Sequence, residues 1–207
     1  MPAKQLARIK CVWIETTALR QTTTEREIMD KQILVVIDAQ NDFITGALGT
    51  PEARAIVPKI IEKIRNFEGP IISTYDTHDD NYLETQEGRL LPIIHCQRHS
   101  LGWSLEPNIF EALWSNDDYY FSVNKSGFGS RQLIEKITDV ASWETNEIIV
   151  IGLVTDVCVI TNVLLLKTFF PKLTITVDAP CCAGTTPENH AAALQVMRSC
   201  QVNVIND

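Results

Sequence analysis

The sequence predicts an α/β domain of three layers, in which a doubly wound, mainly parallel sheet of six strands is covered by helices on both faces. Short apolar runs rich in Val and Ile alternate along the chain with stretches of helical spacing. The runs are continuously apolar, which is typical of strands buried on both faces of a parallel sheet. Alternating strands and helices form right-handed crossovers, and these place helices on both sides of the sheet.

Six apolar segments are the expected strands, and helices are expected between them. The strands are 33–38, 70–75, 118–123, 147–152, 173–178 and 202–205. Apolar side chains recur at helical spacing in the segments 51–67, 130–139, 156–170 and 187–199. Thr50 and Thr186 precede two of these helices as N-cap residues, and a proline follows each of them. The connection 76–117 is too long for a simple link, and long loops in compact domains are usually functional.

The composition is that of a globular protein and excludes several classes of function. The 207 residues include 18 Lys and Arg against 26 Asp and Glu, which gives a net charge of −8. This acidic balance argues against a nucleic-acid partner. No apolar stretch approaches the roughly 20 residues that span a bilayer. The chain has six cysteines, but it is long enough to build a core without disulfide bonds. Because no signal peptide is visible either, we expect a reducing, cytoplasmic compartment.

The first 30 residues differ from the rest of the chain. Segment 1–30 is polar and Thr-rich and lacks a clear strand, whereas 31–207 carries all the strand and helix signals. Two interpretations stand side by side. The segment is an appended tail, or Met29 is the biological start, since a strand begins almost directly after it.

Three polar side chains follow apolar strands and are expected at one edge of the sheet. Asp38 ends the first strand, Lys125 follows the third, and Cys158 follows the fourth near the start of a helix. A thiol at a helix N-terminus beside an ammonium is favoured as thiolate, and a carboxylate can move its proton. Each residue alone also has an ordinary role: a buried thiol, a capping carboxylate and a solvated lysine.

A second group of polar residues lies in the long connection. Asp76 and His78 form a D-x-H pattern directly after the second strand, His95 follows, and Glu84 and Glu87 lie between the histidines. Alternation along an extended segment puts the first two on one side, which suits two ligands of one ion. Imidazole and carboxylate donors suit zinc, iron or manganese. The same residues also suit loop hydrogen bonds alone.

Six short motifs occur in a specific order from about residue 31 to the end of the chain. They are VVIDAQNDF (35–43), TYDTHDD (74–80), LPIIHC (91–96), NKSGFGS (124–130), GLVTDVCV (152–159) and VDAPCCAGTTPENHAAAL (177–194). In this order they resemble the isochorismatase-like cysteine hydrolase superfamily, and within it the nicotinamidase branch. Segment 1–30 lies outside the resemblance, which implies a Rossmann-like sheet for the remainder.

The resemblance implies a catalytic triad formed by Asp38, Lys125 and Cys158. It also implies a non-proline cis peptide bond between Leu153 and Val154. The backbone N–H groups of Val154 and Cys158 are then the expected oxyanion hole. Isochorismatase itself lacks the nucleophilic cysteine, so that activity is set aside.

The resemblance further implies a divalent metal, with zinc as the first choice and iron or manganese as alternatives. Asp76, His78 and His95 match the ligands of the family. Some nicotinamidases add a glutamate between the two histidines, and Glu87 aligns with it better than Glu84, with a gap of one residue.

The substrate is less well defined than the chemistry. Nicotinamidases generally hold the pyridine ring between two aromatic side chains, and Phe43 matches one of them. Leu90 and Leu91 occupy the place of the other, so we expect Leu91 at the substrate and Trp103 as a distant substitute. The hydrolysis of a small carboxamide, with nicotinamide giving nicotinate and ammonia, is the leading prediction.

Two other functions stay open. One is an amidohydrolase of the same superfamily that acts on a carbamoyl or ureido compound. The other is a non-catalytic binding protein that retains the fold. By analogy with relatives that form dimers or tetramers, the chain is expected to be a homo-oligomer.

The remaining cysteines in the domain receive structural predictions. Cys181 and Cys182 are adjacent, which is compatible with redox or metal chemistry, but packing is the expected role. Cys96 is expected to be structural and Cys200 to lie in the core.

Overall fold

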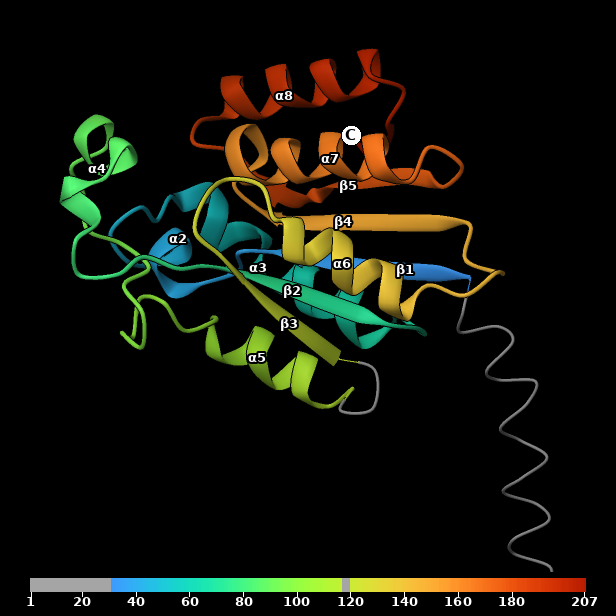
Figure 1. Ribbon diagram of the computed structural model, residues 1–207, viewed down its shortest axis with the longest axis horizontal. Helices are drawn as coiled ribbons and strands as arrows, with labels where there is room; N and C mark the ends of the chain where they lie inside the picture. Colours follow the sequence, from blue (N-terminus) through green and yellow to red (C-terminus); the bar gives the residue numbers. More distant parts are fainter. Residues whose placement is uncertain (1–30, 117–119) are drawn as a thin grey trace, which may run out of the picture.

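The computed structural model describes residues 31–116 and 120–207, which form one six-stranded sheet between two layers of helices (Figure 1). The strand order is β3-β2-β1-β4-β5-β6, and all five neighbouring pairs are parallel. The strands are β1 (Gln32–Ile37), β2 (Ile71–Asp76), β3 (Tyr120–Lys125), β4 (Glu147–Leu153), β5 (Thr174–Ala183) and β6 (Asn203–Ile205). The doubly wound parallel sheet predicted from the sequence is therefore confirmed. Segment 1–30 and the predicted start of β3 at residue 118 lie outside the described residues.

The helices predicted between the strands are present. They are α3 (Pro51–Arg65), α6 (Arg131–Val140), α7 (Ile160–Phe169), which directly follows the π-type turn η3 (Thr155–Val159), and α8 (Pro187–Ser199). Short helices that the sequence did not predict are α2 (Asn41–Ile44), η1 (Tyr82–Glu84), α4 (Gln86–Leu90) and α5 (Pro107–Trp114). Within the described ranges, no helix has the length and apolar character needed to cross a membrane.

The central strand β1 is buried on both faces and separates two hydrophobic cores. Leu34 and Val36 pack with residues of α3 and α5, whereas Ile33, Val35 and Ile37 pack with residues of α6, α7 and α8. Successive side chains of a strand point to opposite faces, so a run of apolar residues is needed to fill both cores. This is the physical reason why the continuous apolar run at 33–38 predicted a buried strand.

The two threonine caps act as the sequence predicted. The Thr50 hydroxyl accepts a hydrogen bond from the Ala53 N–H (3.0 Å), and Thr186 accepts one from the Asn189 N–H (3.1 Å). Such caps satisfy backbone donors that have no partner within the helix. Helix α3 continues through Pro58 as one element.

The cysteines outside the candidate site include one wrong prediction. Cys181 and Cys182 are buried on opposite faces of β5, each in a different core, as expected for packing residues. Cys96 is fully buried. Cys200, by contrast, is exposed rather than in the core. Helix α8 ends one residue earlier, so the apolar face that buries Met197 does not extend to it.

The strand order reverses between β1 and β4. Ligands of doubly wound sheets bind beyond the carboxyl ends of the strands at such a reversal. Asp38 follows β1 here, and the turn that carries Cys158 follows β4. Gly152 makes the close approach possible, because its φ is +117° and a Cβ atom would lie 2.1 Å from the Ile37 carbonyl oxygen.

Candidate active site

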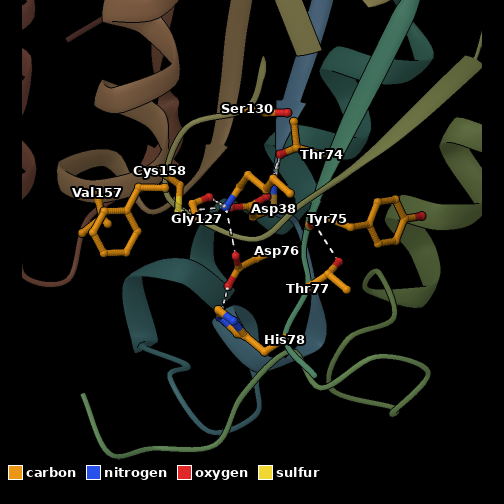
Figure 2. Close-up of polar contacts among 12 residues, drawn as sticks. Asp38, Thr74, Tyr75, Asp76, Thr77, His78, Gly127, Ser130, Val157 and Cys158 are labelled. Atoms are coloured by element: carbon orange, nitrogen blue, oxygen red, sulfur yellow. Dashed lines mark hydrogen bonds and ion pairs between the residues drawn. The ribbon is translucent and has the colours of Figure 1, made fainter. Parts of the chain in front are cut away.

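The ends of three chain segments bring Asp38, Lys125 and Cys158 into contact. The Lys125 Nζ atom lies 2.7 Å from Asp38 Oδ2 and 3.4 Å from Cys158 Sγ. None of the three residues is more than 4% exposed. Figure 2 shows Asp38 and Cys158 meeting at this point, with Asp76 beside them. The three residues named by the sequence therefore form one buried cluster.

Lys125 is held in place by four groups. Besides Asp38 and Cys158, its ammonium donates to Asp76 Oδ1 (3.2 Å) and to the Gly127 carbonyl (3.1 Å). Burial acts to lower the pKa of Lys125. The carboxylates of Asp38 and Asp76 outweigh burial and raise it above its usual value. Lys125 is therefore a permanent ammonium at neutral pH.

Asp38 has one oxygen held and one oxygen free of aligned hydrogen bonds. Thr74 Oγ1 donates to Asp38 Oδ1 (2.6 Å) and accepts from the Asp38 N–H (3.1 Å). Oδ2 pairs with Lys125 by distance but accepts no aligned hydrogen bond from the described residues. Burial raises the pKa of Asp38, and Lys125 offsets part of that rise. A carboxylate with a raised pKa and an available oxygen is suited to accept a proton.

Cys158 lies in the π-type turn η3, and the geometry changes one expectation about it. Burial raises the pKa of the Cys158 thiol well above its usual value, and the lowering effect of Lys125 does not compensate. The helix end and the ammonium indicated by the sequence favour a thiolate, whereas burial in the fold favours the thiol. The reason is that desolvation depends on the whole surrounding structure, whereas the sequence indicated only the neighbouring ammonium and the helix end.

The backbone before Cys158 has the form that the resemblance implied. The peptide bond between Leu153 and Val154 is cis. The Val154 carbonyl accepts hydrogen bonds from the N–H groups of Val157 and Val159, both at 3.1 Å. These bonds fold the chain tightly around Cys158.

Two contacts that the sequence did not reveal hold this turn from the β5–α8 side. Thr155 Oγ1 lies 2.8 Å from His190 Nδ1, and Thr155 is fully buried. Asp156 accepts from the Thr185 N–H (2.8 Å) and from the Thr185 hydroxyl (2.5 Å). The partners lie 29 and 35 positions apart in sequence, so local spacing gave no signal for them.

Asp76, His78 and His95 form a buried cluster of possible metal ligands. One ligand atom from each residue lies within 4.8 Å of the others. Asp76 Oδ2 is 3.0 Å from His78 Nε2 and 3.5 Å from His95 Nε2. The His95 Nδ1 atom is 2.8 Å from the Ile93 carbonyl, which fixes Nδ1 as the donor and leaves the Nε2 lone pair toward the cluster.

The chemistry of this cluster fits a divalent cation. The buried His78 Nε2 atom lies 3.0 Å from Asp76 Oδ2 but makes no aligned hydrogen bond with the described residues, although buried polar atoms normally make one. Glu87 Oε1 lies 3.8 Å from it, whereas Glu84 is exposed on η1. Of the two glutamates, Glu87 is therefore placed to complete a site of two nitrogen and two oxygen donors.

Two residues after β1 support both clusters and were not singled out from the sequence. The Gln40 side chain accepts from the Asp76 N–H (2.8 Å) and donates to the Asp76 carbonyl (2.9 Å). Asp42 Oδ2 accepts from the Cys96 N–H (2.7 Å), next to His95. A signal was present, because two polar residues directly after a buried strand need partners.

A cavity of about 270 Å³ opens onto both clusters. Its lining residues are Phe43, Leu48, Thr50, Asp76, Glu87, Leu91, His95, Phe128, Val154, Val157, Cys158 and Thr185. Phe43 and Leu91 thus lie where the sequence placed them. Trp103 is absent from the lining: it packs on Tyr75 (5.1 Å between ring centroids) and donates to Thr77 Oγ1. Phe128, three residues after Lys125, is the second aromatic side chain of the cavity.

The fold and the two clusters define the class of the protein. It is a parallel α/β domain with a buried thiol centre beside a cluster of one carboxylate and two imidazoles at the carboxyl edge of the sheet. The chain matches the Isochorismatase domain family over residues 32–206. It therefore belongs to the isochorismatase-like hydrolase family.

Solved structures of similar fold support this assignment. The nicotinamidase/pyrazinamidase of Bacillus subtilis has a TM-score of 0.74 and 24% identity, over 84% of this chain and 98% of that one. The zinc complex of Pyrococcus horikoshii pyrazinamidase has a TM-score of 0.69 and 22% identity, over 86% and 99%. The N-carbamoylsarcosine amidase of Thermoplasma acidophilum has a TM-score of 0.63 and 22% identity, over 84% and 95%. The comparison with curated proteins gives no significant match.

Proposed function

We propose that the protein hydrolyses a small uncharged carboxamide, with nicotinamide as the leading substrate. The observation that carries the proposal is the Lys125 ammonium between Asp38 Oδ2 and Cys158 Sγ, with Cys158 in the lining of a largely apolar cavity. A thiol with a neighbouring base and a fixed cation is the arrangement of an activated nucleophile. Two of the structures of similar fold carry the name nicotinamidase or pyrazinamidase, which supports the substrate class.

The reaction begins with the transfer of the Cys158 proton to Asp38. The sulfur attacks the amide carbonyl, and the N–H groups of Val154 and Cys158 bind the oxyanion. Asp38 then gives the proton to the leaving nitrogen, so that ammonia departs and a thioacyl group remains on Cys158. Water attacks this group with Asp38 as base, which releases the carboxylic acid and regenerates the thiol. Lys125 stabilises the negative charge as it moves between sulfur and carboxylate.

Asp76, His78, His95 and Glu87 would hold a divalent cation beside this centre. Their nitrogen and oxygen donors suit zinc, and also iron or manganese. When bound, the cation supplies a Lewis acid that can orient a ring nitrogen of the substrate and activate water.

The cavity favours a neutral substrate over a charged one. Its lining contains no Lys or Arg among the residues that the structure describes. A carbamoylated amino acid would therefore bring a carboxylate that no lining Lys or Arg could pair with, so only the bound cation could offset the desolvation of that charge. Phe43, Leu91 and Phe128 offer apolar surface to a flat ring instead. This apolar lining supports nicotinamide over the carbamoyl rival.

Ammonia release from a panel of amides tests the proposal. The panel contains nicotinamide, benzamide, N-carbamoylsarcosine and N-carbamoylglycine, each assayed with the native protein, Cys158→Ala and Cys200→Ala. We expect release from nicotinamide that is abolished by Cys158→Ala and unchanged by Cys200→Ala. Release that survives Cys158→Ala would exclude the mechanism. A preference for the carbamoyl compounds would support the rival, and nicotinamide binding without release from any amide would support a binding protein.

A further inference from the structure

A second cavity of about 530 Å³ adjoins the metal-ligand cluster; we call it the outer cavity and the first one the substrate cavity. The outer cavity is lined by His78, Thr85, Gln86, Glu87, Leu90, Leu91, Ser126, Gly127 and Phe128. One wall comes from helix α4 and the residue before it, and the other from the loop after β3. Three residues, Glu87, Leu91 and Phe128, line both cavities and so form the partition between them.

The four possible metal ligands divide between the two cavities. Asp76 and His95 line the substrate cavity, His78 lines the outer cavity, and Glu87 lines both. Figure 2 shows His78 on the far side of Asp76 from Cys158. The cluster is therefore part of the partition, and through His78 and Glu87 it borders a cavity that Cys158 does not line.

The two cavities differ in the chemistry of their walls. Beside the Glu87 carboxylate, the outer cavity offers the hydroxyls of Thr85 and Ser126 and the Gln86 amide. Oxygen atoms are suitable temporary ligands of a hydrated dication. No Lys or Arg side chain occurs in this lining within the described part of the chain. The substrate cavity also carries the hydroxyls of Thr50 and Thr185, but beside Cys158 its lining residues are Val154 and Val157, whose side chains cannot replace the water ligands of a cation.

We propose that the outer cavity is the route by which a hydrated divalent cation reaches and leaves the cluster of Asp76, His78, His95 and Glu87. The substrate cavity then serves the amide and its products. This inference rests on the metal site of the proposed function. Its consequence is that metal exchange depends on the outer cavity and is independent of the width of the substrate cavity.

The test is the rate at which a chromogenic chelator in large excess withdraws zinc from the loaded protein. Gln86→Trp and Ser126→Phe narrow the outer cavity from opposite walls, and both positions are exposed, so the larger side chains can be accommodated. Gln195→Trp places the same new side chain on an exposed position of α8 as the matched control. Leu48→Trp narrows the substrate cavity alone.

We expect zinc release to slow several-fold in Gln86→Trp and Ser126→Phe. It should keep the native rate in Gln195→Trp and Leu48→Trp, whereas Leu48→Trp should raise the KM for nicotinamide. Native release rates in both outer-cavity variants, with native circular dichroism, would overturn the proposal, as would slowing by Leu48→Trp. A protein that elemental analysis shows to bind no divalent cation would overturn it too. Ammonia release by the native protein decides the amidase proposal separately.

Discussion

Asp76 joins the thiol centre to the metal-ligand cluster: its Oδ1 atom lies 3.2 Å from Lys125 Nζ, while its Oδ2 atom lies 3.0 Å from His78 Nε2. Asp76 and Lys125 are also register partners at the carboxyl ends of β2 and β3. Because pairing in the sheet fixes these two backbones, one carboxylate can serve both clusters. A change at Asp76 should therefore affect the two clusters together, and a change at His78 only one.

The first prediction separates Asp76→Asn from His78→Ala. Both variants should lose bound metal by elemental analysis, because each removes a ligand. The charge of Asp76 raises the pKa of Cys158, so Asp76→Asn should lower that pKa and accelerate alkylation by iodoacetamide at neutral pH. His78→Ala should leave the alkylation rate close to that of the metal-free native protein. Equal alkylation rates in the two variants would contradict the shared role of Asp76.

The second prediction concerns the pH dependence of Cys158 alkylation. Since burial raises the pKa of Cys158, less thiolate is present at any given pH than for a free thiol, whose pKa is about 8.5. The rate should be slow at neutral pH and should still rise above pH values of about 8.5, where a free thiol levels off. Lys125→Met should shift the profile to still higher pH, because Lys125 lowers the pKa of Cys158.

Mass spectrometry of the peptide that contains Cys158 measures this rate separately from those of the other cysteines. Alkylation of the exposed Cys200 in the same sample shows that the iodoacetamide is active. A rate at Cys158 that is already maximal in mildly acidic buffer would show a resting thiolate and contradict the prediction.

The third prediction is a large loss of stability in Lys125→Met. The substitution leaves the buried carboxylates of Asp38 and Asp76 without their ammonium, and breaking a buried pair in this way costs about 3–5 kcal/mol. Arg131→Met, which removes the exposed ion pair with Glu135, should have a far smaller effect. Urea unfolding at neutral pH measures the free energy of unfolding of the native protein and of the two variants.

Lys125→Met lowers the free energy of unfolding, and this stability deficit should become smaller as the pH is lowered. The pKa of Asp38 is raised above its ordinary value in the fold, and losing Lys125 removes an effect that lowers it. The folded state then binds more protons than the unfolded state, so stability falls as pH rises through the folded pKa and recovers as pH falls. A deficit that stays constant between neutral and mildly acidic pH would contradict this account.

The sequence predicted the positions of the catalytic candidates better than their charge states. Asp38, Lys125 and Cys158 could be brought together from sequence, because the carboxyl ends of parallel strands lie at one edge. The protonation state of Cys158 could not be predicted from the sequence, because its burial depends on side chains from distant segments of the chain. The same reason hides the contact between Thr155 and His190, whose elements meet only in the folded chain.

The long connection between β2 and β3 was the hardest segment to predict. Helices α4 and α5 and the turn η1 are only 3 to 8 residues long, too short for an apolar period to stand out. The sequence did not predict a role for Phe128, which is half-exposed in a Gly-rich loop. In such loops the sequence pattern says little about where a side chain points. The metal ligands in this connection were found as a D-x-H pattern and by resemblance, and the structure brings their side chains together.

The last prediction assigns a positioning role to the contact between Thr155 and His190. Thr155 begins the turn that carries Cys158, and its hydroxyl lies 2.8 Å from His190 Nδ1 on helix α8. Burial lowers the pKa of His190, so the imidazole is neutral at pH values near 7 and can accept the threonine hydroxyl proton. The contact thus ties the nucleophile turn to a long helix on the outside of the sheet.

Loss of this contact should reduce kcat and leave KM nearly unchanged, because neither residue lines the substrate cavity. A displacement of the nucleophile by about 1 Å is enough to lower the rate on the order of 100-fold. Thr155→Val and His190→Ala should each show this loss, and Thr155→Ser, which keeps the hydroxyl, should restore most of the rate. The double variant should lose no more than the worse single variant, since the two side chains act as one unit. Additive losses, or an equal loss in the control Gln195→Ala on the same helix, would show that the contact does not position Cys158.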